Sequence, residues 1–131
     1  MRLVDTTFLI DLLKQAPGVD AKALLLQEEG ELFTTEINVY EVFYGGYAGD
    51  DVADDLEIVR RLIDAFTVLP LARRASLKAA EIAGVLHKRG QNIGDSDILT
   101  AGIALANGIS TIVTRNIRHF ERVPGLTVES Y

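Results

Sequence analysis

The stretch that decides the fold is MRLVDTT, residues 1–7, which runs from apolar side chains to a carboxylate and two threonines. Helical apolar spacing begins near Phe8, so the stretch predicts a strand, Leu3–Asp5, that leads directly into a helix. Ligands bind at the carboxyl ends of strands in open α/β sheets. Asp5 can act there as a ligand, or it can cap the helix by accepting a backbone N–H group, and this segment alone favours neither.

Five short β-like segments alternate with helical segments, and this order predicts an α/β fold with a parallel sheet covered on both faces. The expected strands are Leu3–Asp5, Glu31–Thr34, Phe66–Leu69, Thr111–Thr114 and Leu126–Glu129. No repeat, low-complexity tract or linker interrupts them, so residues 1–131 are expected to form a single domain. Because the carboxyl ends of parallel strands share one edge, we expect acids that follow different strands to meet there.

Glu41 is the first of these further acids. It lies mid-helix among apolar neighbours, one turn after Asn38. Its rival Glu36 lies in the first turn, where the helix dipole alone explains an acid. Five residues rotate a helix by about 140°, so both side chains cannot point into one pocket. We therefore expect Glu41 to join Asp5.

The segment GDSDILTA, residues 94–101, begins another helix and carries two acids. Acids at a helix start satisfy free N–H groups, but two acids exceed what capping needs. We expect Asp97 to project toward Asp5. Asp95 is expected to cap the helix or to support the cluster, and it is retained as a further candidate metal ligand.

Asn116 follows the fourth expected strand, where its amide oxygen can coordinate a cation directly or through a water. His119 is interpreted as a surface residue and not as a base. The chain has no cysteine and only two histidines, which excludes thiol chemistry and leaves oxygen ligands for any metal. Carboxylates about 4 Å apart repel by roughly 4 kcal/mol at an effective dielectric constant near 20, so a cluster must bind protons or a cation. Oxygen ligands select Mg²⁺, with Mn²⁺ as the alternative, and a metal-activated water can attack a phosphodiester.

The formal net charge of −6 argues against a chain that coats nucleic acid. If four acids serve one metal site, −6 becomes −2, and local basic groups can then guide a phosphate backbone. These groups, which also suit solvated helix faces, are Arg60-Arg61, Arg73-Arg74, Lys88-Arg89, Arg115, Arg118 and Arg122. No apolar run approaches the ~20 residues of a membrane span, and no cleavable leader is recognised. We expect a cytoplasmic protein without membrane contact.

The chain resembles the PIN-domain ribonucleases, specifically the VapC-type toxins of VapBC toxin–antitoxin pairs, over essentially its whole length. The pieces that carry the resemblance are LVDTTFLI (residues 3–10), YEVFYG (residues 40–45), DILTA (residues 97–101) and VTRN (residues 113–116) with Phe120. The resemblance implies a three-layer α/β/α domain with a five-stranded, mostly parallel sheet. It implies a Mg²⁺-dependent endoribonuclease acting on tRNA, rRNA or mRNA, usually homodimeric, and silenced by a VapB-type antitoxin whose C-terminal segment occupies the site.

The resemblance also assigns roles to single residues. Asp5, Glu41 and Asp97 carry over as the acidic metal site, with Thr6 and Thr114 as supporting hydroxyls. Family members often have an aspartate at the position of Asn116 or His119, and neither is acidic here. Asp95 is the candidate to compensate, which favours one firmly held metal over two.

Two readings of the function stay open. The first is the metal-dependent nuclease, and the second is a PIN-like scaffold that binds RNA or protein with weak or no catalysis, because the fourth acid is missing. A phosphatase of the haloacid-dehalogenase type requires a second aspartate where Thr7 stands. The aromatic set Tyr40, Phe43, Tyr44 and Tyr47 has helical spacing and is interpreted as core or as a dimer face.

Overall fold

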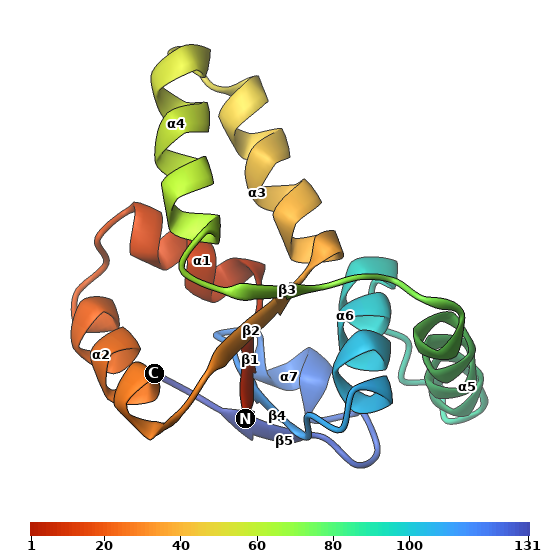
Figure 1. The fold of residues 1–131 in the computed structure, drawn as a ribbon. Coiled ribbons are helices and arrows are strands. Elements are labelled where there is room, and N and C mark those ends of the chain that lie inside the picture. The colour runs from red at the N-terminus through yellow and green to blue at the C-terminus, as the bar shows by residue number, and fades with distance from the viewer.

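The computed structural model describes residues 1–131 and contains one five-stranded sheet with helices on both faces (Figure 1). The strands are β1 (Arg2–Val4), β2 (Leu32–Thr35), β3 (Thr67–Leu69), β4 (Thr111–Val113) and β5 (Thr127–Glu129). The helices are α1 (Thr6–Leu13), α2 (Val19–Glu29), α3 (Glu36–Ala48), α4 (Val52–Ile63), α5 (Arg73–Lys88), α6 (Asp95–Ala106) and α7 (Ile117–Phe120). The predicted α/β fold and its five strands are therefore confirmed, with strand ends shifted by at most one residue.

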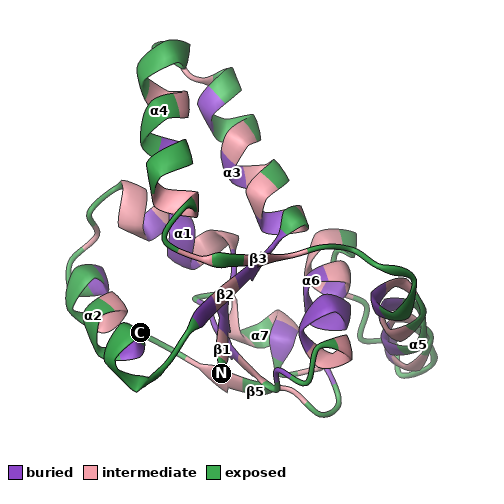
Figure 2. Cartoon of the chain, viewed as in Figure 1, coloured by how far each residue is buried: buried purple, intermediate pink, exposed green.

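The strand order is β3-β2-β1-β4-β5, and every neighbouring pair is parallel. The sheet is thus wholly parallel, where a mostly parallel one was expected. Adjacent residues of β1 face opposite cores, because Leu3 packs with α5 and α6 while Val4 packs with α1 and α2. Figure 2 shows the central strands as buried, which is the usual condition of a parallel sheet.

The centre of the sheet determines where a ligand can bind. The chain runs outward from β1 in one direction through β2 and β3, and in the other through β4 and β5. The crevice at such a switch point lies outside the carboxyl ends of the two central strands. Register pairs Val4 with Val113, so Asp5 and Thr114, the next residues along each strand, emerge side by side.

Helix α6 packs very closely against α5. A β-carbon placed on Gly102 would lie 2.7 Å from Ala79 Cβ and 2.8 Å from Ala75 O. Only glycine permits this approach, which anchors α6 and its acidic first turn against the fold.

None of the helices combines the length and the apolar composition that crossing a membrane requires.

Helices α3 and α4 project together from the body of the protein (Figure 1). The aromatic set of α3 divides in two, because Phe43 packs against the core while Tyr40, Tyr44 and Tyr47 are exposed. The interpretation as core is therefore wrong for the three tyrosines, which lie on the outer face of the helix. Their use as a dimer face stays a prediction.

Candidate active site

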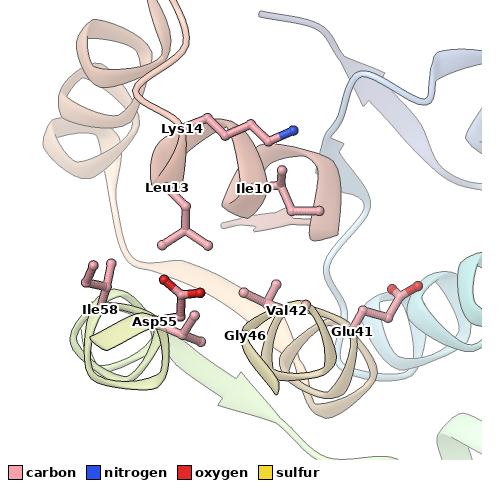
Figure 3. Close-up of a pocket in the computed structure, with 10 residues that line it drawn as sticks. Ile10, Leu13, Lys14, Glu41, Val42, Gly46, Asp55 and Ile58 are labelled. Carbon is pink, nitrogen blue, oxygen red and sulfur yellow. The ribbon is translucent and has the colours of Figure 1, made fainter. Parts of the chain in front are cut away.

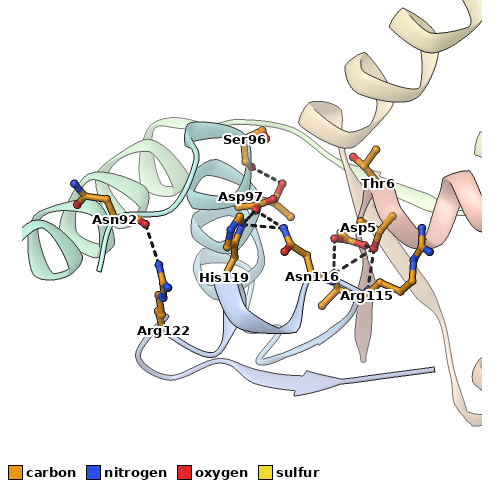
Figure 4. Close-up of polar contacts among 12 residues, drawn as sticks. Asp5, Thr6, Asn92, Ser96, Asp97, Arg115, Asn116, His119 and Arg122 are labelled. Carbon is orange, nitrogen blue, oxygen red and sulfur yellow. Dashed lines mark hydrogen bonds and ion pairs between the residues drawn. The ribbon is translucent and has the colours of Figure 1, made fainter. Parts of the chain in front are cut away.

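Asp5 lies at the junction of β1 and α1 with only 2% of its surface exposed. Its Oδ1 accepts hydrogen bonds from the Thr7 hydroxyl at 2.6 Å and from the Phe8 N–H at 3.2 Å. Its Oδ2 accepts one from the Thr114 hydroxyl at 2.6 Å (Figure 4). Asp5 therefore caps α1 and also stands at the carboxyl edge of the sheet, so the two roles considered from the sequence coexist.

The electrostatic state of Asp5 reflects a balance. Burial raises the pKa of its carboxyl above the usual range, while the hydrogen bonds from Thr114, Thr7 and Phe8 lower it and the charge of Asp97 raises it slightly. Burial is the largest of these effects. A desolvated carboxylate with a second acid nearby is stabilised by a cation.

Glu41 reaches the same edge from α3. The Thr6 hydroxyl donates a hydrogen bond of 2.6 Å to its Oε1, and the Asn38 amide donates one of 3.0 Å to Thr6. Asn38 is itself buried and accepts a hydrogen bond of 2.8 Å from Thr35, the residue that ends β2. Glu36 lies exposed in the first turn. The structure thus links Glu41 to the residue after Asp5, while Glu36 faces solvent.

A second polar cluster, called the acidic group below, forms where α6 and α7 meet and consists of Asp97, Asn116 and His119. Asp97 Oδ2 accepts a hydrogen bond of 2.9 Å from the Asn116 amide and lies 2.7 Å from His119 Nδ1. Asn116 Nδ2 and His119 Nδ1 are 2.8 Å apart, so the three polar atoms form a triangle (Figure 4). His119 is partly exposed, as expected of a surface residue, but its ring also contacts Asp97 and Asn116, which the sequence interpretation did not foresee. Its position one turn after Asn116 on a short helix was the available signal.

Asp95 does not join this group. It is exposed and lines the grooves between α5 and α6 with Ala83 and Ile98. Two residues rotate a helix by about 200°, so Asp95 and Asp97 leave α6 on opposite sides. The structure offers no support for Asp95 as a substitute fourth acid.

Sequence reasoning missed a polar network beside Thr7. Arg115 donates its backbone N–H to the Thr7 hydroxyl at 3.0 Å, and its Nε lies 2.9 Å from Oδ2 of the buried Asp11. The Tyr131 hydroxyl donates a 2.6 Å hydrogen bond to the same oxygen. Burial, and then this bond to Asp11, raise the pKa of Tyr131. Asp11 lies within a helix and belongs to no recognisable motif, so nothing in the sequence marked it.

The chemistry of the donor set fits a hard divalent cation, since Asp5, Glu41 and Asp97 offer carboxylate oxygens and Asn116 an amide. Burial of the Asp5 carboxyl raises its pKa and so disfavours its charged form, a cost that a bound cation would offset. No three histidine, aspartate or glutamate side chains are close enough to enclose an ion. Hydroxyl, amide and imidazole groups contact the oxygens of these carboxylates instead. Ion binding therefore requires some of these side chains to rotate.

Comparison with known proteins identifies the family to which this chain belongs. The PIN domain family model matches residues 2–126, and the chain therefore belongs to the PIN domain family. A tRNA(fMet)-specific endonuclease VapC of Salmonella typhimurium is 30% identical over 97 residues, which cover 74% of this chain and 73% of that protein. Ribonuclease VapC2 of Haemophilus influenzae is 26% identical over 129 residues, or 98% and 96% of the two chains.

Among solved structures, DNA-bound VapBC from Salmonella typhimurium matches with a TM-score of 0.89 and 27% identity, covering 98% of this chain and 96% of that one. The resemblance to VapC-type PIN domains expected from the sequence is thereby confirmed.

Replacement of Asp5 by asparagine tests its burial. The folded protein holds a proton on Asp5 more tightly than the unfolded chain does, so this group's contribution to stability is lost as the pH rises through its raised pKa. Asparagine caps a helix as well as aspartate and does not titrate. In metal-free buffer, Asp5→Asn should therefore have a larger free energy of unfolding than wild type at pH 7, with a difference that shrinks toward pH ~4.

Urea titrations at several pH values measure this difference. The matched control is Asp50→Asn, which changes an exposed acid and should leave stability unchanged. An Asp5→Asn variant that is less stable than wild type at pH 7 would contradict the assignment.

Proposed function

We propose that the protein is a Mg²⁺-dependent endoribonuclease that hydrolyses RNA phosphodiester bonds. The observation that carries the proposal is the buried carboxylate of Asp5 at the switch point of the sheet, with its pKa raised by burial and by Asp97. The relatives named as ribonuclease and as tRNA(fMet)-specific endonuclease support the same chemistry. For this chain we propose tRNA as the first RNA to test, with rRNA and mRNA as further candidates.

The residues divide into ligands and supports. Asp5, Glu41 and Asp97 would hold Mg²⁺ or Mn²⁺, and the bound ion would supply Lewis-acid chemistry by making water more acidic and offsetting phosphate charge. Thr6 orients Glu41, and Thr114 orients Asp5, through the hydrogen bonds of 2.6 Å that they donate.

Asn116 and His119 form a separate support. Both lie within 2.9 Å of Asp97 Oδ2 and hold that carboxylate at the edge of the sheet. The resemblance to VapC-type toxins implies that an acid often stands at one of these two positions, where this chain has an amide and an imidazole.

A specific observation favours an antitoxin partner. A groove of about 370 Å³ lies between α1, α3 and α4 (Figure 3). Apolar side chains, including Ile10, Val42 and Ile58, line it, and Glu41 lies at its rim. We propose that a VapB-type antitoxin fills this groove and reaches the acids through Glu41. The similarity to a solved VapBC complex supports a VapB-type partner. We also propose that the protein acts in the cytoplasm as a homodimer.

The second candidate function is an RNA-binding or protein-binding scaffold with little catalysis. It is favoured by the absence of a fourth acid, since Asn116 and His119 stand beside Asp97. Cleavage distinguishes the two functions. Purified protein should cut end-labelled tRNA(fMet) in Mg²⁺ or Mn²⁺ and should stop cutting in excess chelator.

The Asp5→Asn variant should lose about 10²-fold or more of the cleavage rate, because transition-state charge is no longer offset at the site. Asp50→Asn is the control and should cut as wild type does. Cleavage that persists in chelator, or in Asp5→Asn, would refute the metal-dependent mechanism. A folded wild type that binds tRNA without cutting it would favour the scaffold.

The groove is tested with Ile58→Asp, a change of an exposed groove residue. A buried charge opposes apolar docking, so binding of the antitoxin encoded beside the gene should weaken by about tenfold or more while cleavage is retained. Leu77→Asp, a change of another exposed apolar residue, on α5, is the control. Calorimetry measures affinity, and light scattering on the same samples gives the mass expected of a dimer. Equal antitoxin affinity in the two variants would exclude this groove.

A further inference from the structure

A polar pocket of about 410 Å³ lies beside α7, outside the acidic group. Five residues line it, and none is apolar: Arg89, Gln91, Arg118, Glu121 and Arg122. Arg89 caps the end of α5 and Gln91 follows it, while the other three belong to α7 and the turn after it. Two segments distant in sequence therefore bring three guanidinium groups to one cavity.

The three arginines carry charge that the protein does not neutralise. None of them forms an ion pair, although Glu121 lines the same pocket. On α4, by contrast, Arg60 and Arg61 both pair with Glu57. In a chain of net charge −6, the pocket is a local excess of positive charge, and such an excess attracts an anion.

The pocket is also partly fixed in shape. Nη1 of Arg122 donates a hydrogen bond of 3.1 Å to the Asn92 carbonyl, which ties the turn after α7 to the loop before α6. Helical hydrogen bonds continue past the end of α7, from the Glu121 N–H to Ile117 O and from the Arg122 N–H to His119 O. Arg118 and Arg122, four residues apart, therefore project from the same side.

The same segments carry the acidic group. Arg118 precedes His119, whose Nδ1 lies 2.7 Å from Asp97 Oδ2. The loop that contains Asn92 leads directly into α6, whose first turn carries Asp97. Figure 4 shows Asn92 and Arg122 in the same view as this acidic group. The pocket therefore adjoins the acidic group, on the side where phosphates next to the reacting bond of a bound RNA would be sought.

We propose that Arg89, Arg118 and Arg122 bind the phosphodiester backbone of the RNA beside the bond that is cut. One guanidinium group can donate two parallel N–H hydrogen bonds to the oxygens of a phosphate. A cavity with three guanidinium groups therefore suits a phosphate backbone. The lack of apolar lining favours a nucleic-acid backbone over an acidic peptide, which would also bury side chains. The inference rests on the proposed function, because it takes RNA as the substrate.

The test measures RNA affinity apart from cleavage. Fluorescent tRNA(fMet) is titrated in chelator with the double variant Arg118→Gln/Arg122→Gln, and with Arg60→Gln/Arg61→Gln as the control of equal charge change. Loss of two phosphate contacts should weaken binding by about tenfold or more and reduce the slope of log affinity against log salt by about 1.4 to 1.8. The control should bind as wild type does. Arg89→Gln, an exposed change at a helix end, gives a second variant if the first does not fold.

Affinity and salt slope equal to those of wild type would overturn the inference, as would a wild type that does not bind tRNA(fMet). A loss confined to antitoxin binding would assign the pocket to an acidic peptide and would also overturn it. Cleavage in Mg²⁺ separates the two proposals. Arginine-dependent binding without any cleavage would refute the nuclease but leave the pocket, whereas wild-type cleavage unaffected in both arginine variants would refute the pocket alone.

Discussion

The buried carboxylate of Asp5 is the interaction on which the rest of the site depends. Through Thr7, Phe8 and Thr114 it joins the end of β1 to the start of α1 and to the end of β4. These bonds hold a charged group at the centre of a wholly parallel sheet, where burial opposes its ionisation. The fold thus maintains an acid whose charged form it does not fully compensate. Binding of a proton or a cation would offset this cost.

Regular local patterns allowed much of this arrangement to be predicted from the sequence. The alternation of strand and helix predicted the α/β fold, and the run from Leu3 to Asp5 predicted an acid at the carboxyl edge. Helix rotation favoured Glu41 over Glu36, and the structure links Glu41 to Thr6 and leaves Glu36 in solvent. Each of these inferences depended on residues close together in sequence.

Features that depend on distant packing could not be predicted in the same way. Position in the first turn favoured Asp97 over Asp95, but the sequence left Asp95 as a candidate ligand, and only the packing of α5 against α6 shows that it faces away from the sheet edge. The pairing of Asp11 with Arg115, more than a hundred residues apart, leaves no local trace. The contact of His119 with Asp97 depends on the packing of α7 against α6, which the sequence does not reveal. The sequence left the tyrosines of α3 as core or a dimer face, and only the projection of the α3–α4 pair shows that they are exposed.

Acids from separate segments, Asp5, Glu41 and Asp97, are proposed to serve one divalent cation. Anomalous scattering from crystals grown with Mn²⁺ can locate such an ion without reference to activity. We expect an ordered Mn²⁺ coordinated by carboxylate oxygens of Asp5 and Asp97, with the side chains of Asn116 and His119 turned to admit it. A crystal with no Mn²⁺ at this edge, or with the ion held by Asp95, would contradict this proposal.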